Sequence, residues 1–248
     1  MLLPKKSKGN ITVFFFYDDD HIELRDEFKR LIKIGTKVVL TNSNTPFVHK
    51  LYEGYLSEVF ETKRLISSNA TNRRGEDLVI YSINGKKKLD SKQELLENFP
   101  GTRYMGSKYK MLPFLWDTIK DLEFKSALDA FSGNGCVSYM LKQKGIKVYS
   151  NDFMEFSANI TKSTVENSAI KIEQEDLDKL LEINTNTRNF ISTTFKGLYF
   201  SDEDNRFLDC LIANINQIED QYKKSLAFAS IIRACHCCPL KSGRLKIK

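Results

Sequence analysis

Apolar and polar positions along the chain fall into blocks that predict strands and helices in turn. Residues 11–17 (ITVFFFY) and 36–42 (TKVVLTN) are apolar runs of strand length, and the second reads as a buried strand. Between them, residues 18–35 repeat apolar side chains at helical spacing, begin with three acids suited to a helix N-terminus and end at a glycine. Residues 45–55 (TPFVHKLYEGY) predict a short helix with Pro46 near its start.

The pattern then changes to a pair of strands. Residues 57–63 (SEVFETK) and 77–83 (DLVIYSI) predict strands on either side of a polar loop. Residues 84–101 are polar and charged, which is typical of a linker. Residues 102–120 (TRYMGSKYKMLPFLWDTIK) predict a turn that leads into a helix containing Pro113.

Helical periodicity dominates the C-terminal part of the chain. Residues 152–170 predict a helix, and residues 170–189 predict a helix followed by a loop. Residues 201–218 predict a strongly amphipathic helix capped by Ser201, and residues 223–234 predict a last helix. Because strands alternate with helices along the chain, the sequence predicts the α/β class.

The central stretch LDAFSGNGCVSYMLKQKGIKVYSNDF (residues 128–153) reads as strand, glycine turn, helix and second strand. Gly133 and Gly135 permit a tight turn that brings backbone close to a ligand. Asp152 closes the second strand about 20 residues beyond this turn, where a carboxylate can receive the two hydroxyls of a ribose. The unit predicts a nucleoside-containing ligand, and the alternative is an ordinary β-α-β crossover with a glycine turn.

Ser138 stands where a dinucleotide-binding turn has its third glycine. A nicotinamide-dependent oxidoreductase is therefore disfavoured, and the sequence holds no hydride-transfer constellation to support one. A single nucleoside without phosphate, such as S-adenosylmethionine, does not need the third glycine.

Composition limits the partners and the cellular location that the chain can have. The 248 residues carry a net charge of +6 with a pI near 8.9, which permits a polyanionic partner without demanding one. No apolar run approaches the roughly 20 residues of a membrane span, and the first ten residues lack the apolar core of a signal peptide. Five cysteines suit a reducing cytoplasm. Residues 235–238 (CHCC) are too crowded for a typical structural zinc site, and the simpler interpretation is a helix end, so no metal is predicted.

Several stretches together resemble the adenine-specific (N6) DNA methyltransferases of restriction–modification systems, in particular the GATC-type adenine methylase group. RYMGSKYK (Arg103–Lys110) is similar to the motif that precedes the first strand of this family, and DAFSGNG (Asp129–Gly135) to its cofactor turn. Asp152 is placed like the family's ribose-binding acid, and residues 197–215 resemble a helical stretch of many members. The matches cover residues 102–234.

The resemblance implies S-adenosylmethionine as cofactor and double-stranded DNA as partner. It places Tyr104 against the adenine and Lys108 towards the carboxylate of the cofactor. Phe131 either packs beside the cofactor or belongs to the core. The residues that the resemblance assigns to cofactor binding are Tyr104, Lys108, Asp129, Phe131, Gly133, Gly135 and Asp152.

The N-terminal part resembles the other end of the same family. Residues 38–55 are similar to the late strand and loop after the catalytic motif, and residues 63–82 to the closing segment with its basic loop. The expected domains are thus residues 1–83 as a C-terminal-type half, 84–101 as linker and 102–248 as an N-terminal-type cofactor-binding half. The implied fold is an incomplete Rossmann-like methyltransferase sheet built from two half-domains.

The family performs its chemistry at a D-P-P-Y or N-P-P-Y motif, and this sequence contains no P-P-Y. The nearest substitutes are Tyr17, which could stack on a base, and Asp18, which could accept from an amine; helix capping is the competing role for Asp18. One explanation is a fragment or relic of a tandem enzyme, inactive alone. Another is a permuted enzyme, or a non-catalytic binding subunit, completed by a second methyltransferase chain that supplies the motif.

Basic residues cluster around the polar loop between the two predicted strands of residues 57–83. As contacts to the DNA backbone they would give salt-dependent affinity that does not read sequence. A solvated basic loop is the alternative. The four residues are Lys63, Arg64, Arg73 and Arg74.

Overall fold

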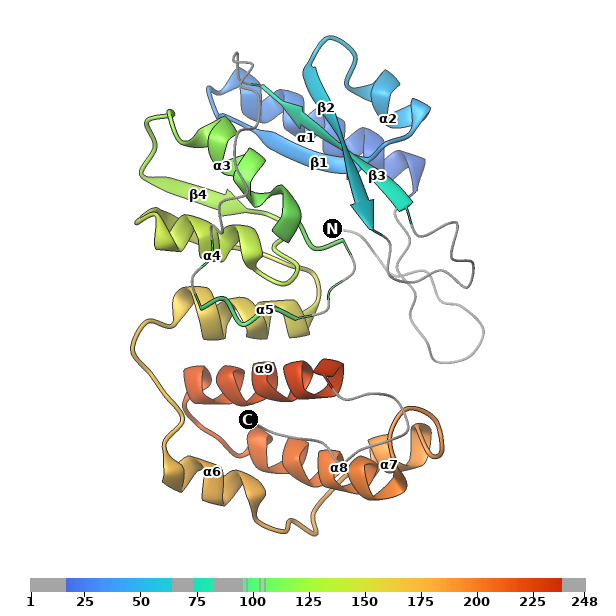
Figure 1. Ribbon diagram of the computed structural model, residues 1–248, viewed down its shortest axis with the longest axis vertical. Coiled ribbons are helices and arrows are strands. Elements are labelled where there is room, and N and C mark those ends of the chain that lie inside the picture. The colour runs from blue at the N-terminus through green and yellow to red at the C-terminus, as the bar shows by residue number, and fades with distance from the viewer. Residues whose placement is uncertain are drawn as a thin grey trace. The chain divides into compact units, whose positions relative to one another are not determined.

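The computed structural model describes residues 17–63, 74–82, 96, 98–102, 104 and 106–237. They form mixed α/β structure in two compact units, Met1–Lys88 and Leu89–Lys248 (Figure 1). The strand predicted at residues 11–17 lies outside the described residues except for Tyr17, and most of the predicted linker also lies outside them. The assignment of the two parts of the chain to opposite halves of a methyltransferase stays a prediction.

The described residues of the first unit form a three-stranded antiparallel sheet with two helices. The strands have the order β1-β3-β2, and Val39 of β1 and Leu56 of β2 both pair with Tyr81 of β3. The apolar core consists of Phe28, Val48, Tyr52, Leu78 and Ile80. The elements are α1 (Asp18–Lys33), β1 (Val39–Ser43), α2 (Pro46–Leu51), β2 (Leu56–Lys63) and β3 (Arg74–Tyr81).

The helices of this unit begin and end at the capping residues that the sequence predicted. The Asp20 carboxylate accepts a hydrogen bond from the Tyr17 backbone N–H (2.6 Å) at the start of α1, and three acids occupy its first turn. Gly35, with a φ of 86°, follows its end. The Thr45 hydroxyl accepts from the Val48 N–H (3.2 Å) and caps α2, with Pro46 in the first turn.

The positions of the strands in the sheet decide how deeply each is buried. Val79 and Tyr81 on one face of the central strand β3 are buried, as are Leu78 and Ile80 on the other. The strand predicted to be buried at residues 36–42 forms β1 instead at the sheet edge, where its side chains are half-buried or exposed. The prediction of deep burial for that strand was wrong because an apolar run does not reveal an edge position.

The second unit contains one parallel strand pair and a succession of helices. β4 (Ser126–Asp129) and β5 (Lys147–Ser150) pair in parallel, and α4 (Cys136–Gln143) connects them as predicted. Ahead of them lie a short 3₁₀ turn (Tyr109–Met111) and α3 (Leu112–Ile119). The later elements are α5 (Glu155–Thr161), α6 (Gln174–Leu181), α7 (Phe190–Thr194), α8 (Asp202–Asn216) and α9 (Gln221–Cys237).

Among its described residues, two apolar cores stabilise this unit. One lies around α4, where Leu112, Met140 and Leu141 are buried and Ala127 and Val148 of the two strands pack against them. The other joins α6, α8 and α9, and its buried members are Leu180, Leu208, Leu211, Ile215, Ala227 and Ile231.

The helix predicted over residues 152–170 is shorter and changes its winding. It starts at Glu155, and after Thr161 it continues as a π-helical turn (Lys162–Glu166). The Lys142 ammonium of α4 donates to the carbonyls of Thr164 (3.0 Å) and Asn167 (2.5 Å), which binds this turn to α4. Side-chain spacing alone does not distinguish α from π winding, so the sequence could not predict this change.

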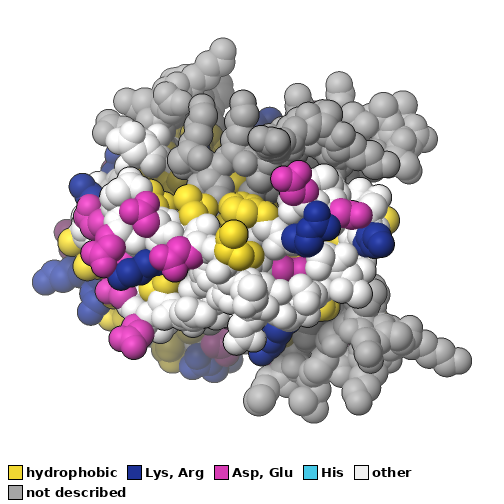
Figure 2. Space-filling model, turned by 90° about the horizontal axis from the view of Figure 1, so that it is seen from below, with side chains coloured by type: hydrophobic (Ala, Val, Ile, Leu, Met, Phe, Trp, Pro, Cys, Tyr) yellow, Lys and Arg dark blue, Asp and Glu magenta, His cyan; other side chains and the backbone are white. Residues whose placement is uncertain are grey.

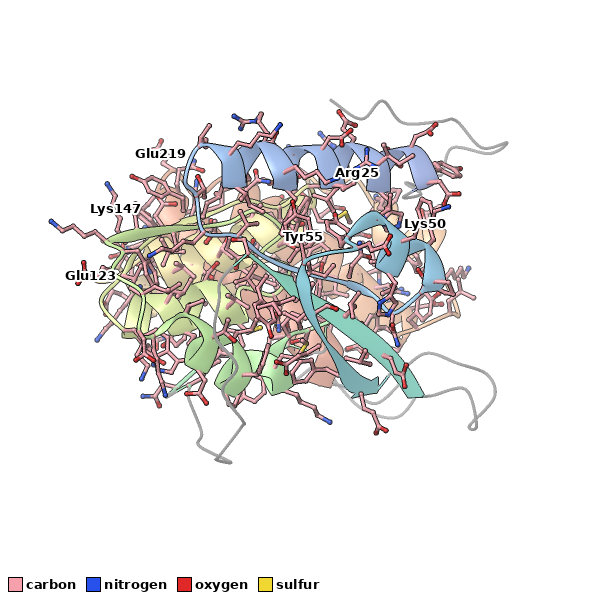
Figure 3. All side chains as sticks on the ribbon, turned by 90° about the horizontal axis from the view of Figure 1, so that it is seen from above. Arg25, Lys50, Tyr55, Glu123, Lys147 and Glu219 are labelled. Carbon is pink, nitrogen blue, oxygen red and sulfur yellow. The ribbon has the colours of Figure 1, made fainter. Side chains whose placement is uncertain are left out.

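The sheet of the second unit has one covered face and one exposed face. Ala127 and Val148 face the core around α4, whereas Leu128 and Tyr149 on the opposite face are 68% and 52% exposed. Glu123 and Lys147, at the amino ends of the two strands, project outward (Figure 3). Parallel sheets are normally covered on both faces, so this exposed apolar surface is unusual.

No helix among the described residues combines the length and the apolar character needed to cross a lipid bilayer.

Candidate cofactor site

The site is the turn between β4 and α4, residues 130–135. Gly133 and Gly135 both adopt left-handed backbone conformations, with φ of 53° and 75°. The Gly135 N–H donates to the Ser132 carbonyl (2.7 Å), and α4 begins immediately afterwards. Side chains disfavour this conformation, so the turn explains both glycines.

Asp152 joins this turn to the carboxyl end of β5. One oxygen of its carboxylate accepts from the Gly133 N–H (2.7 Å), and the other accepts from the Met154 N–H (2.9 Å). Each carboxylate oxygen can accept more than one hydrogen bond, so these bonds leave capacity for ligand hydroxyls. The half-buried Asp152 side chain therefore stands at the edge of the turn, and its role as ribose acceptor stays a prediction.

Tyr104 lies against the turn although it is far from it in the sequence. A Cβ atom placed on Gly133 would be 2.9 Å from Tyr104 Cε1, so the ring needs glycine at that position. The Tyr104 ring also lies 5.8 Å from the Phe156 ring of α5, measured between centroids. Burial raises the pKa of the Tyr104 hydroxyl. An aromatic wall from a distant segment thus forms one side of the turn.

Gly135 is closely packed as well. A Cβ atom there would lie 2.9 Å from Thr161 Cγ2 on α5. The Thr161 hydroxyl donates to the carbonyls of Ser157 and Ala158 in its own helix, which fixes the methyl group in place. The close approach of α5 is thus a second reason for glycine at this position.

Asp129 points into the protein. Its carboxylate accepts from the Ser138 hydroxyl (2.6 Å), which in turn accepts from the Ser150 hydroxyl (2.8 Å). Burial raises the pKa of the Asp129 carboxyl. Ser138 is fully buried, and its hydroxyl fills the gap between helix and strands where the third glycine of a dinucleotide turn would stand. Direct contact between Asp129 and a cofactor stays a prediction.

The segment that contains Lys108 is tied to the other side of the turn. The Ser107 hydroxyl accepts from the Asn134 amide (3.1 Å) and lies 3.9 Å from the Cys136 sulfur. Burial raises the pKa of the Cys136 thiol to about 11, so that thiol is unreactive at neutral pH. Lys108 follows Ser107 and is half-buried. The predicted cofactor residues from Tyr104 to Asp152 therefore converge on one turn.

Exposed aromatic rings stand at the carboxyl ends of both strands. Phe131, after β4, is 65% exposed, so the alternative that it belongs to the core is wrong. Phe153, after β5, is 64% exposed and was missed by the sequence reasoning. The sequence feature that could have identified Phe153 is an aromatic residue directly after the acid at the end of a predicted strand. Both rings offer apolar surface beside Asp152 that a planar base could cover.

One hydroxyl beside the turn, that of Ser132, is buried without a hydrogen-bond partner among the residues that the structure describes. A buried hydroxyl without a partner is destabilising, and such groups are found where a ligand or water completes them. This fits a polar ligand such as an adenosyl group.

The remaining predicted residues lie elsewhere. Tyr17 and Asp18 are exposed at the start of α1 in the first unit. Lys63 ends β2 and pairs with Arg74 at the start of β3, while Arg64 and Arg73 lie outside the described residues. Within the described part of the chain, no group of three or more metal-ligating side chains could hold a metal ion. Cys235 lies in the last turns of α9, and Cys238 is outside the described residues.

A glycine turn between parallel strands, with a carboxylate closing the second strand, is typical of nucleoside-binding α/β units. A profile of the D12 class N6 adenine-specific DNA methyltransferases matches residues 104–238, which contain the whole of this turn. The chain belongs to this family.

Two individual relatives of the chain are also methyltransferases. Over 136 residues, 55% of this chain and 40% of the relative, the chain is 26% identical to the type II methyltransferase M2.HphI of Haemophilus parahaemolyticus. Over 64 residues, 25% of this chain and 22% of the relative, it is 39% identical to the type II methyltransferase M.MjaIII of Methanocaldococcus jannaschii. The chain thus spans less than half the length of these curated relatives. No solved structure matches it.

Proposed function

We propose that the protein acts in transfer of a methyl group from S-adenosylmethionine to the N6 amine of adenine in double-stranded DNA, within a restriction–modification system. The observation that carries the proposal is the hydrogen bond from the Gly133 N–H to the Asp152 carboxylate, at a turn where Tyr104 also converges. Family membership supports the same chemistry. The location that suits this reaction is the cytoplasm.

In this proposal, different residues around the turn bind different parts of the cofactor. Asp152 accepts from the ribose hydroxyls, while Tyr104 and the exposed rings of Phe131 and Phe153 cover the adenine. Lys108 lies towards the carboxylate of the methionine part, and its charge is complementary to it. The cofactor supplies an electrophilic methyl group on a sulfonium. Gly133 and Gly135 let Tyr104 and Thr161 pack against the turn that receives the cofactor, because a Cβ atom at either glycine would meet those side chains.

Asp129 acts on the cofactor through the turn. Its carboxylate, bonded to Ser138, fixes the start of α4 relative to both strands. The turn is then held in one conformation beside the ligand, with the Gly133 and Gly135 N–H groups bonded to Asp152 and Ser132. This makes Asp129 a positioning residue in the proposal, in keeping with its burial.

The finer fold proposed is a Rossmann-like methyltransferase sheet assembled from two half-domains. The parallel pair β4–β5 would belong to its cofactor half, and the antiparallel order β1-β3-β2 to its other half. A strand with a P-P-Y motif would complete the enzyme and grip the flipped adenine by stacking and by hydrogen bonds to its amine. A second methyltransferase chain is the proposed source of this strand. If no second chain supplies the strand, Tyr17 is the candidate for stacking on the adenine and Asp18 for accepting from its amine.

Two measurements test the proposal. Calorimetric titration of the purified chain with S-adenosylhomocysteine should show binding at one site, and NAD should not bind. Transfer of labelled methyl groups to unmethylated duplex DNA is then measured with the chain alone and with the product of a neighbouring methyltransferase gene. Incorporation at adenine in either case supports the function. Binding of NAD in place of the adenosyl ligand would overturn it.

A further inference from the structure

Helix α5 forms one side of the cofactor turn through two contacts. A Cβ atom placed on Gly135 would lie 2.9 Å from Thr161 Cγ2, and the Phe156 ring lies 5.8 Å from the Tyr104 ring, measured between centroids. Within the second unit, α5 lies between α4 and α9 (Figure 1). Whatever sets the distance of α5 from the turn therefore also sets the shape of the site.

The winding of the chain changes directly after these contacts. The π-helical turn Lys162–Glu166 follows Thr161, and the Asn167 N–H donates to the Lys162 carbonyl (3.0 Å) at the spacing of π winding. Inside the turn, a serine and a threonine hydroxyl each donate back to the same carbonyl of α5 (2.8 Å each). Hydroxyls that bond back in this way favour departures from α winding. Because π turns inside helices are frequent at functional sites, this turn is a candidate for a role in the site beside it.

Lys142, in the last turn of α4, binds this π turn. Its ammonium donates to the carbonyls of Thr164 (3.0 Å) and Asn167 (2.5 Å). Carbonyls at the carboxyl end of a helix lack helical donors, and a cation is favourable there. The Lys142 side chain is half-buried, whereas lysine and arginine side chains on the face seen from below project from the surface (Figure 2). Burial lowers the pKa of the Lys142 ammonium, so this charge is partly desolvated where it holds the turn.

The contacts with Thr161 and with the π turn lie at opposite ends of α4. Gly135, which meets Thr161, immediately precedes the first residue of α4, and Lys142 lies about two helical turns later, roughly 10 Å along the axis. The chain from Thr161 to Asn167 therefore follows α4 and contacts it at both ends. One residue more or less in the winding between these contacts would rotate the later carbonyls by about 100° and away from the ammonium. The Lys142 bonds are thus matched to the π winding.

Helix α9 supports α5 from its other side. The Tyr222 hydroxyl donates to the Glu166 carboxylate at the end of the π turn (2.9 Å), and the Ser225 hydroxyl bonds to the Asn159 side chain of α5 (3.0 Å). These bonds do not depend on Lys142. Loss of the Lys142 ammonium should therefore let α5 shift relative to the cofactor turn without detaching it from the unit.

We propose that Lys142 is a positioning residue for the cofactor: by tying the π turn to the end of α4, it keeps α5 at the distance at which Thr161 and Phe156 shape the turn. The inference rests on the proposed function, since it names what holds one wall of the cofactor site. Lys142 acts through the carbonyls of Thr164 and Asn167 and not by contact with the ligand. A lysine that only stabilised the fold would change the unfolding free energy and leave the cofactor affinity of the folded chain unchanged.

The first test uses the full chain without cofactor. Gly135→Ala places a Cβ atom against Thr161, so its cost depends on how firmly α5 is held at the turn. The fall in the urea midpoint caused by Gly135→Ala should be smaller in a Lys142→Met background than in the natural chain, because α5 can then move away from the new methyl group. Lys144→Met removes an exposed lysine at the same end of α4 and, as the matched control, should leave that fall unchanged. An equal fall in all three backgrounds would overturn the inference.

The second test measures the cofactor site. Lys142→Met should weaken S-adenosylhomocysteine binding by roughly tenfold, as expected when hydrogen bonds from a charged group are lost. Lys142→Arg keeps the charge and two or more donors, so it should retain most of the affinity. Calorimetric titration measures both variants, with Lys144→Met as control. Unchanged affinity in Lys142→Met, together with a lowered urea midpoint, would show that this lysine is structural only and would contradict the inference.

The two tests distinguish this inference from the proposed function. If the natural chain does not bind S-adenosylhomocysteine, the proposed function fails, and the urea experiment still decides whether Lys142 holds α5 at the turn. If the natural chain binds it and Lys142→Met changes neither the affinity nor the cost of Gly135→Ala, the inference fails and the proposed function stands. Lys142→Gln keeps an amide donor and is the milder change, which replaces Lys142→Met in both tests if the methionine variant does not fold.

Discussion

The backbone N–H of Gly133 donates to the Asp152 carboxylate over 2.7 Å, across 19 residues of sequence. This bond joins the ends of two neighbouring parallel strands, so the acid proposed to bind ribose also shapes the turn that receives the cofactor. A change at Asp152 therefore acts on ligand affinity and on local stability together.

Asp152→Ala should weaken S-adenosylhomocysteine binding by roughly tenfold to a hundredfold, from the 1.5–3 kcal/mol typical of hydrogen bonds to a charged group. It also leaves the N–H groups of Gly133 and Met154 without their acceptor. Asp152→Asn retains one acceptor oxygen and should lose less stability than the alanine variant. Calorimetry and urea denaturation measure the two effects, with Glu219→Gln on the exposed surface as control. Full affinity in Asp152→Ala would contradict the proposed site.

Gly135→Ala should destabilise the fold by backbone strain and by contact with Thr161. Gly145 is the matched control, because it has the same φ of 75° but no atom within 4 Å of a Cβ placed there. Gly145→Ala thus measures the strain alone, about 1–2 kcal/mol. Thr161→Ser removes the methyl group that a Cβ at Gly135 would meet at 2.9 Å while keeping the hydroxyl. It should partly rescue Gly135→Ala.

A double-mutant cycle of Gly135→Ala and Thr161→Ser, followed by urea denaturation, gives the coupling energy. If Gly135→Ala costs no more than Gly145→Ala, the close approach of α5 to the turn is wrong.

Asp129 should make stability depend on pH. Burial raises the pKa of its carboxyl in the folded chain above the value in the unfolded chain. The folded state therefore keeps the proton to higher pH, and the stability from this group is full below the unfolded pKa and is lost as pH rises through the folded pKa. Asp129→Asn does not titrate, and the oxygen of the new amide can accept from the Ser138 hydroxyl as the carboxylate does.

The difference in unfolding free energy between Asp129→Asn and the natural chain should thus shift in favour of the variant as pH rises above about 4, the unfolded value for aspartate. Urea denaturation over a series of pH values measures it. A difference that stays constant over the series would show that the Asp129 carboxyl has the same pKa in both states.

Ser201→Ala should destabilise the second unit by about 1 kcal/mol, because the Ser201 hydroxyl accepts from the Asp204 N–H (3.0 Å) at the start of α8. Ser201→Thr keeps the acceptor and should cost only a fraction of this. Thermal unfolding followed by circular dichroism reports the difference. Ser168→Ala, in an exposed loop, is the control for loss of a serine hydroxyl.

Local chemistry made much of the fold predictable. Ser201, Thr45 with Pro46, and the acids at 18–20 mark helix starts, and each begins a helix in the structure. The glycine turn with its strand, helix and strand is also where the sequence placed it. These signals are predictable because caps and turns depend on residues only a few positions apart.

Contacts between segments that are distant in the sequence could not be predicted from it. Nothing in the sequence indicates that Tyr104 rests on Gly133, that Thr161 approaches Gly135, or that Ser138 bonds to Asp129. The edge position of β1 and the π winding after Thr161 likewise depend on packing. The pattern itself indicated Gly133, Gly135 and Asp152, whereas the other predicted cofactor residues came from a resemblance. Phe153 was missed because an aromatic residue at a strand end is usually core.

The exposed face of β4–β5 has a consequence for the life of the protein in a cell. Leu128 and Tyr149 present apolar surface on a folded sheet, which is what chaperones and quality-control proteases bind. The amount of protein that accumulates should then be governed by how quickly that face is covered after synthesis. The abundance of the protein would then depend on whether that face is covered.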